Sequence, residues 1–212
     1  MLKVLLVDDH TVVRQGMKQI LESKFGPIEF GEAIDGVQAL SKIRQQKWDL
    51  VFLDISLPDA SGVQVLKKIQ ICDASLPVLV LSNYPESQYA VRLLKAGAAG
   101  YLSKDAEEDD IVKAVQLACN GRKYVSSSVA ELLASQLEKN NDDSDNRHEK
   151  LSNREYEIFL ELAEGKRVTD IADKLRISSK TVSTHRARIF QKMDFPNNAG
   201  LVLYANEMCL LN

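Results

Sequence analysis

The chain has 212 residues, of which 45% are hydrophobic and 27% charged, a composition typical of a folded protein with a buried core rather than a disordered or fibrous one. No run approaches the eighteen or more apolar residues of a membrane helix, and the start LKVLLVDDH lacks a secretory signal, so we expect a cytoplasmic protein without a membrane partner. The net charge of −3 combines 17 Lys+Arg and 22 Asp+Glu over residues 1–149 with 10 and 8 over residues 150–212, so only the second part is net basic.

Five short apolar runs in the first 105 residues are typical of buried strands. Between them, apolar residues three and four apart, as in 12–21 and 63–69, predict helices. Strands that alternate with helices predict an α/β doubly wound domain with a parallel sheet covered on both faces. The predicted strands are Leu2–Val7, Ile28–Ile34, Leu50–Ile55, Pro77–Leu81 and Ala99–Leu102. The cysteines Cys72, Cys119 and Cys209 lie in apolar helical segments, and we expect buried or partly buried free thiols.

A helix from about Glu108 to Asn120 closes this domain, with Gly121 as its stop, and a further helix is expected from about Ser128 to Leu137. The next thirteen residues, EKNNDDSDNRHEK, contain no apolar side chain and cannot offset the entropy of ordering, which predicts a flexible linker. We therefore expect a first domain at residues 1–125, a helix and flexible polar linker at 126–150, and a helical domain at 151–212.

Polar side chains stand where four of the predicted strands end: Asp8 and Asp9, Asp54, Ser82 and Lys104. Ligands of doubly wound sheets bind outside the carboxyl ends of the strands, so these side chains are expected to converge at one edge. Three carboxylates in one place repel each other unless a cation lies between them, and oxygen ligands suit Mg²⁺. The pattern predicts a magnesium site. The alternative for Asp9 is that it only caps the following helix.

Asp54 is the predicted reactive residue of this pocket. With Mg²⁺ bound, a carboxylate can attack a phosphoryl group and form an aspartyl phosphate. Asp54 lies on the central strand, with the metal acids on one side and Ser82 and Lys104 on the other. The Lys104 ammonium and the metal would offset the charge on the transferring oxygens. We therefore expect Asp54 to be a phosphoacceptor.

The segments VLLVDDH, LVFLDISLPDASG, VLVLSN and KAGAAGYLSKD resemble, in this order, the receiver motifs of two-component response regulators. The resemblance covers residues 1 to about 125 and implies a flavodoxin-like fold with five parallel strands. It also implies that a sensor histidine kinase phosphorylates Asp54. By the same resemblance, Asp9, Asp54 and the Ser56 carbonyl would ligate Mg²⁺, and Asp8 would contribute through water.

The resemblance implies a switch as well. Ser82 would hydrogen-bond the phosphoryl group, Lys104 would pair with it, and Tyr101 would change rotamer. The alternative for Tyr101 is an ordinary half-buried strand aromatic. Ser56 and Tyr84 would flank the path of attacking water and tune the lifetime of the phosphoryl group, with the bulky Tyr84 as a shield.

The segment VTDIADKLRISSKTVSTHRARIFQKM predicts a helix-turn-helix, with Ser178 as the N-cap of the second helix. On that helix Val182, Ile189 and Met193 share one side and are expected to be buried. Six basic residues and no acidic one lie between positions 174 and 192, which suggests a polyanion partner, the alternative being a solvated helix face. The six are Lys174, Arg176, Lys180, Arg186, Arg188 and Lys192.

Residues 151–212 resemble the four-helix DNA-binding domain of the LuxR type, through the LSNRE start, the EG turn, KTV, His185 and the closing KM. Receiver plus LuxR-type domain is the arrangement of the NarL/FixJ class of transcription regulators. The resemblance places Ser183, Thr184 and Ala187 at base-facing positions. The expected phosphate contacts are Lys180, Thr181, Arg186 and Arg188.

Other residues of this domain have competing interpretations. His185 is expected to pack against the preceding helix rather than contact DNA, and Arg154 to form an internal ion pair with a Glu. Leu201, Val202 and Leu203 resemble the family's dimerisation element, although burial within the domain would explain part of that pattern.

These features predict a transcription regulator that is switched by Mg²⁺-dependent phosphorylation of Asp54, dimerises when phosphorylated and binds double-stranded promoter DNA. RNA polymerase is a further candidate partner. We expect no enzymatic activity beyond self-phosphorylation and dephosphorylation, because an aspartyl-phosphate phosphatase needs a second acid where this chain has Ser56. The alternative is a phosphorylation-independent DNA-binding protein whose receiver serves only for dimerisation.

Overall fold

The computed structural model describes residues 1–58, 62–139, 147–208 and 210–211. The chain divides into two compact units, Met1–Gln136 and Leu137–Asn212. Among the described residues, every helix is too short or too polar to cross a membrane.

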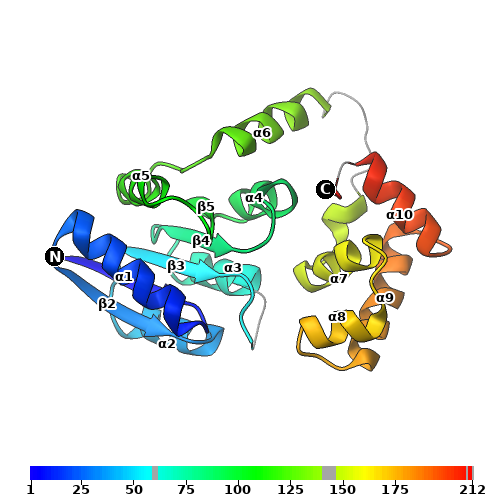
Figure 1. Cartoon of the computed structure of the whole chain (residues 1–212), viewed down its shortest axis with the longest axis horizontal. Helices are drawn as coiled ribbons and strands as arrows, with labels where there is room; N and C mark the ends of the chain where they lie inside the picture. The colour runs from blue at the N-terminus through cyan, green and yellow to red at the C-terminus, as the bar shows by residue number, and fades with distance from the viewer. Residues whose placement is uncertain (59–61, 140–146, 209, 212) are drawn as a thin grey trace. The chain divides into compact units, whose positions relative to one another are not determined.

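The first unit is built on a five-stranded parallel sheet with the strand order β2-β1-β3-β4-β5 (Figure 1). This order confirms the predicted doubly wound fold. The strands are β1 (Leu2–Val7), β2 (Ile28–Ala33), β3 (Leu50–Asp54), β4 (Val78–Ser82) and β5 (Gly100–Ser103). The helices are α1 (Thr11–Phe25), α2 (Gly36–Gln45), α3 (Gly62–Cys72), α4 (Glu86–Lys95), α5 (Glu108–Cys119) and α6 (Ser127–Lys139), which extends past the boundary between the units.

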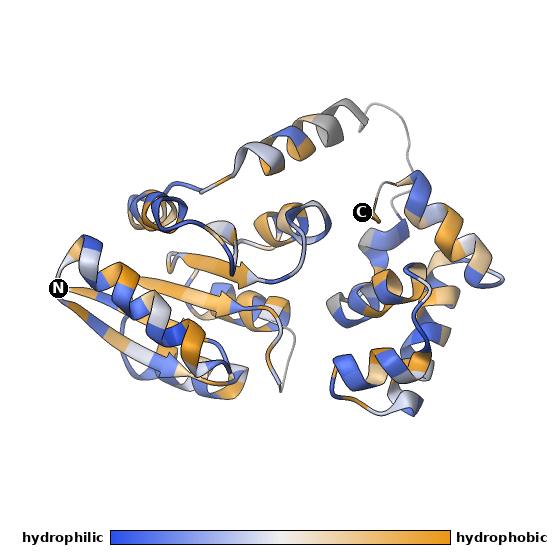
Figure 2. Ribbon diagram, viewed as in Figure 1, coloured by the Kyte–Doolittle hydropathy of each residue, from blue (hydrophilic) through white to orange (hydrophobic). Residues whose placement is uncertain are grey.

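The central strands β3 and β4 are buried on both faces, which explains why they are almost continuously apolar in sequence (Figure 2). Every residue of β3 and β4 is buried. On one face, Met17 and Leu21 of α1 and Ile111 of α5 join the core formed by Phe52 and Leu79. Each such side chain contributes roughly 1.5–3 kcal/mol on burial, so the central strands hold the residues at their ends in fixed positions.

The second unit is helical throughout its described part. It contains the 3₁₀ helix η1 (Arg147–Lys150), α7 (Asn153–Ala163), α8 (Val168–Lys174), α9 (Ser179–Met193) and α10 (Asn198–Glu207). Ser152 and Glu155 form a reciprocal capping box at the start of α7, and Ser178 caps α9 as predicted. Val182, Ile189 and Met193 are buried, which confirms the predicted inner side of α9.

Three expectations need correction or restriction. Asp9 does not cap α1, because the N-cap residue is His10 and its backbone N–H donates to the Asp8 carboxylate at 2.7 Å. Cys72 and Cys119 are exposed free thiols, since they end α3 and α5 on the outer side, and Cys209 lies outside the described residues. The predicted linker contains η1, while its residues 140–146 lie outside the described part of the chain.

Candidate functional site

Four strand ends bring the predicted pocket residues together. Asp8 directly follows β1, Asp54 ends β3, Ser82 ends β4 and Lys104 follows β5. These four strands are consecutive neighbours in the sheet, so their carboxyl ends share one edge. Asp8 is 2% exposed and Asp54 is fully buried. The pocket therefore contains two carboxylates that are removed from water.

Lys104 is the cation of this pocket. Its Nζ lies 2.8 Å from Oδ2 of Asp54 and 2.7 Å from Oδ2 of Asp8. Burial lowers the pKa of Lys104, but its hydrogen bonds with Asp54 and Asp8 outweigh this effect and the pKa is raised. Burial also raises the pKa of Asp54, against the opposing effect of Lys104 and of the Ser56 N–H that donates to Oδ1 at 2.9 Å. Lys104 is thus a fixed positive charge beside Asp54.

A group of four side chains offers ligand atoms to a cation at the same edge. One atom each from Asp8, Asp9, His10 and Asp54 lies within 4.8 Å of all the others. Nδ1 of His10 lies 3.0 Å from Oδ1 of Asp8 and 2.8 Å from Oδ1 of Asp9. Three carboxylates, two of them buried, with ligand atoms this close together fit a divalent cation with oxygen ligands. His10 was not among the residues predicted for this pocket, although its position directly after the aspartate pair was a signal.

Gly62 fixes the backbone behind Asp54. Its N–H donates to the carbonyl of Ile55 at 2.9 Å, and a Cβ at this position would lie 2.4 Å from the backbone oxygen of Asp54. A side chain here would displace the end of β3. The glycine in the predicted LPDASG motif therefore has a steric role in positioning the pocket.

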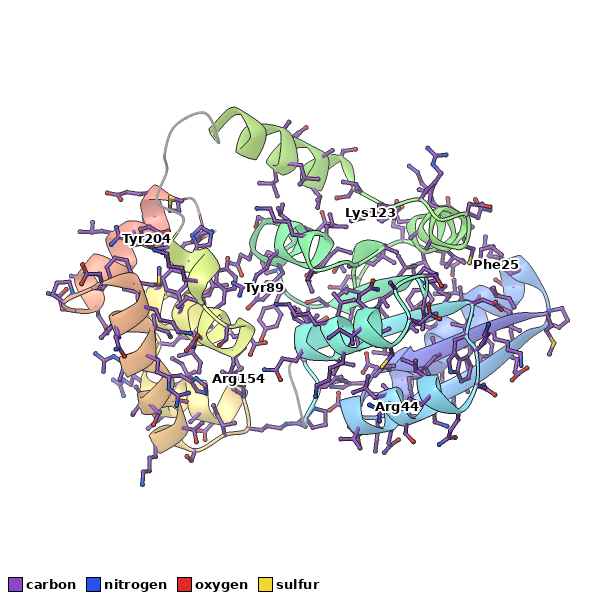
Figure 3. All side chains as sticks on the ribbon, turned by 180° about the vertical axis from the view of Figure 1, so that it is seen from behind. Phe25, Arg44, Tyr89, Lys123, Arg154 and Tyr204 are labelled. Atoms are coloured by element: carbon purple, nitrogen blue, oxygen red, sulfur yellow. The ribbon has the colours of Figure 1, made fainter. Side chains whose placement is uncertain are left out.

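The side chains of Ser82 and Tyr101 both hydrogen-bond with the backbone of Tyr84, which lies two residues after Ser82. The Tyr84 N–H donates to Oγ of Ser82 at 3.0 Å, and the Tyr101 hydroxyl donates to the Tyr84 carbonyl at 2.5 Å. Tyr101 is buried rather than half-buried as its alternative interpretation required, and burial raises its pKa. Tyr89 lies on α4 (Figure 3). Its ring lies 4.8 Å from the ring of Tyr84. The pocket is thus joined by hydrogen bonds to Tyr84, two residues before α4, and Tyr84 contacts α4 through the ring of Tyr89.

The start of α4 is in turn joined to the start of α6. Glu86, the first residue of α4, accepts hydrogen bonds from the hydroxyls of Ser126 and Ser128, the former at 2.7 Å. Ser126 also accepts the Val129 N–H at 3.3 Å, which is a cap of the first turn of α6. Two helices that are far apart in sequence are therefore held together at one carboxylate.

On α9, the predicted base-facing residues Ser183, Thr184 and Ala187 are exposed. Lys180, Thr181 and Arg188 are exposed as well. Arg186 differs, because its guanidinium lies 5.1 Å from the centre of the Phe190 ring and donates to Asn198 at 3.2 Å. It is half-buried within the domain and is less available for a phosphate than its neighbours.

Of the six basic residues between positions 174 and 192, the first and the last are paired with buried acids of α7. Lys174 lies 2.6 Å from Glu161, and Lys192 lies 2.7 Å from Glu155. These pairs offset part of the positive charge of this segment, and the exposed basic residues between them are Arg176, Lys180 and Arg188.

Arg154, on α7 (Figure 3), pairs with Glu157 at 2.7 Å and donates to the Leu175 carbonyl at 2.9 Å, so its predicted internal role is confirmed. His185 is half-buried, and burial lowers its pKa. On α10, Leu201 is buried in the core of the domain, which removes it from any dimer surface in this conformation. Val202 is half-buried and Leu203 is 63% exposed.

A doubly wound domain with a strand-end acidic pocket that Lys104 closes, followed by a helix-turn-helix domain, defines a response regulator. Sequence comparison agrees: residues 4–116 match the response regulator receiver domain, and residues 149–205 match the bacterial regulatory proteins of the luxR family. The chain belongs to the response regulator family and is a two-component transcription regulator.

Among its relatives, the response regulator UvrY of Escherichia coli K12 is 35% identical over 213 residues, which cover 100% of this chain and 97% of that one. The response regulator GacA of Pseudomonas aeruginosa is 35% identical over 206 residues, covering 97% and 95%. Among solved structures, RcsB of Salmonella enterica serovar Typhimurium, bound to promoter P1flhDC with the phosphomimetic BeF₃⁻, is 26% identical with a TM-score of 0.60 and covers 96% of this chain and 97% of its own.

Proposed function

We propose that a histidine kinase transfers a phosphoryl group to Asp54 and that this transfer controls DNA binding. A carboxylate oxygen of Asp54 attacks phosphorus, the bond from phosphorus to the kinase imidazole breaks, and the imidazole nitrogen keeps the electron pair. The observation that carries this proposal is the placement of Asp54, which is fully buried. Its Oδ1 accepts the Ser56 N–H, and its Oδ2 lies 2.8 Å from Lys104 Nζ. Lys104 provides fixed charge for the phosphoryl oxygens.

Asp8, Asp9, Asp54 and the Ser56 carbonyl are the proposed holders of Mg²⁺. When bound, Mg²⁺ supplies further positive charge to the transferring oxygens. The support is the cluster of ligand atoms within 4.8 Å. Lys104 forms ion pairs with two of these carboxylates, Asp8 and Asp54, and these pairs hold both side chains in place without a metal.

The proposed switch runs from Ser82 to the start of α6. A phosphoryl group on Asp54 recruits the Ser82 hydroxyl, which withdraws it from the Tyr84 N–H. Tyr84 also holds the Tyr101 hydroxyl, and it is two residues before Glu86, whose carboxylate binds Ser126 and Ser128. A shift of the segment 82–86 would therefore reach the helix that leads out of the receiver.

We further propose that α9 enters the major groove of promoter DNA in the cytoplasm. Its exposed short side chains Ser183, Thr184 and Ala187 allow close approach to base edges, while Lys180 and Arg188 neutralise phosphates. In one solved relative, two RcsB dimers are bound to two parallel DNAs. We propose a phosphorylated dimer here too, with Val202 and Leu203 as its α10 contacts, and RNA polymerase as a further candidate partner.

The test measures promoter binding with and without phosphorylation. Acetyl phosphate or BeF₃⁻ with Mg²⁺ should strengthen binding by the natural chain, and Asp54→Ala should abolish the gain without abolishing folding. If Asp54→Ala binds promoters as tightly as the phosphorylated chain, the switch is wrong and DNA binding is phosphorylation-independent.

A further inference from the structure

Arg14 is a buried cation at the edge of the pocket that neither the switch nor the phosphoryl contacts use. It lies on the first turn of α1, and its side chain is 9% exposed. The guanidinium is hydrogen-bonded on three sides within the receiver. Nη1 donates to the backbone carbonyl of Asp8 at 2.7 Å, Nε donates to Glu32 at 2.6 Å, and Nη2 donates to Thr11 at 3.3 Å.

The bond to Asp8 acts on the peptide unit between the two aspartates. The Asp8 carbonyl belongs to the same planar group as the Asp9 N–H, so the guanidinium fixes the direction in which the chain leaves Asp8. The other groups of Asp8 are also held: its N–H donates to Ala33, Oδ1 accepts from the His10 N–H, and Oδ2 meets Lys104. Arg14 holds the one backbone group of Asp8 that leads directly to Asp9.

We propose that Arg14 is a positioning residue for the metal site, which acts through the Asp8 carbonyl to orient Asp9. This rests on the proposed function of the pocket. A guanidinium can bridge Glu32 and the Asp8 carbonyl at once because it is planar and has donors on two edges, whereas a lysine ammonium offers a compact point charge. The geometry, and not only the charge, is therefore needed. Replacing a residue that hydrogen-bonds to a metal ligand typically lowers metal affinity 10–100-fold.

The experiment is a calorimetric Mg²⁺ titration of the full chain, with thermal unfolding measured in parallel. Arg14→Met and Arg14→Lys are both expected to raise the Mg²⁺ dissociation constant by about tenfold, and saturating Mg²⁺ should restore phosphorylation by acetyl phosphate. Lys18→Met is the matched control, because Lys18 lies on the same helix and pairs with Glu32 without contacting Asp8. The Mg²⁺ dissociation constant of Lys18→Met should stay within about twofold of that of the natural chain, because Lys18 does not hydrogen-bond to a proposed metal ligand.

Three results would overturn the proposal. Natural affinity in Arg14→Lys would mean that charge alone matters, and a lower melting temperature with unchanged Mg²⁺ affinity in both variants would mean a purely structural role. Absence of Mg²⁺ binding by the natural chain would overturn the proposed metal site together with the role of Arg14, and it is distinguished by the behaviour of the unmodified protein. Arg14→Lys keeps the test available if Arg14→Met does not fold.

Discussion

Lys104 Nζ lies 2.8 Å from Oδ2 of Asp54, and the two side chains are only 8% and 1% exposed. Removing the ammonium leaves Asp54 and Asp8 as buried carboxylates without their cation. We expect Lys104→Met to lower the free energy of unfolding of the receiver by about 3 kcal/mol at neutral pH. Urea unfolding followed by Trp48, the one tryptophan of the chain, measures this in the receiver alone.

Lys3→Met is the control for this comparison. Lys3 pairs with Glu29 at 3.0 Å, but the two side chains are 40% and 36% exposed, against 8% and 1% for the Lys104–Asp54 pair. Its loss should change the free energy of unfolding by less than about 1 kcal/mol. Equal losses in the two variants would mean that the Lys104 pair contributes no more than a surface pair.

The raised pKa of Asp54 has a consequence for stability against pH. Burial favours the protonated form in the folded state, so this contribution is complete below the pKa of the unfolded chain and is lost as the pH rises through the higher folded pKa. Asp54→Asn lacks the titration. We therefore expect the natural receiver to lose stability relative to Asp54→Asn as the pH is raised from about 4, the unperturbed aspartate value, to 7. The check is the free energy of unfolding of both proteins, measured at several pH values across this range. The same pH dependence in both would contradict the prediction.

Tyr84 is expected to control the lifetime of the phosphoryl group. Its ring lies 4.8 Å from the ring of Tyr89 on α4, and its backbone hydrogen-bonds with both Ser82 and Tyr101. Tyr84→Ala should lose phosphate faster because water gains access, whereas Tyr84→Phe should keep the ring and decay like the natural chain. Decay of radiolabelled phosphoprotein in Mg²⁺ buffer gives both rates. Equal decay in Tyr84→Ala and the natural chain would remove the shielding role.

Glu86 is expected to affect transmission without affecting phosphorylation. Glu86→Ala removes the acceptor shared by Ser126 and Ser128 and should reduce the gain in DNA affinity on phosphorylation by about 1 kcal/mol, or about fivefold. The double variant Ser126→Ala, Ser128→Ala should reproduce this. Glu29→Ala is the control, since Glu29 pairs with Lys3 on β1. A full phosphorylation-dependent gain in Glu86→Ala would show that α6 receives no signal through this contact.

Arg188 and Lys174 are expected to differ in their effect on DNA binding, although both are among the six basic residues between positions 174 and 192. Arg188 is exposed on α9, and Arg188→Ala should weaken binding to all sequences and lower the slope of log affinity against log salt by about 1. Lys174 is paired with Glu161, so Lys174→Ala should leave that slope nearly unchanged. Filter binding over a range of salt concentrations measures both. Identical slopes in the two variants would mean that the ion pair does not restrict Lys174.

The fold was predictable because the central strands β3 and β4 are continuously apolar up to a polar last residue and are separated by segments of helical periodicity. For the same reason the strand ends shift by only one residue, as where β4 ends at Ser82 rather than Leu81. The convergence of Asp8, Asp54 and Lys104 followed from strand order alone, since neighbouring parallel strands end at one edge.

The contacts of long side chains were not predictable. Arg14 reaching the Asp8 carbonyl, and Glu86 reaching Ser126, depend on how two elements face each other rather than on spacing within one. Arg186 shows the same limit, because its engagement with Phe190 and Asn198 depends on the packing of α10 against the domain.

The 3₁₀ helix η1 determines where the smallest independent DNA-binding fragment begins. Arg147 lies over the rings of Phe195 and Tyr204 and donates to the Met193 carbonyl at 3.0 Å. His148 lies 2.8 Å from the Tyr204 hydroxyl. A fragment cut at Leu151, where the family motif starts, would expose these aromatic rings, whereas one that begins before Arg147 keeps them covered.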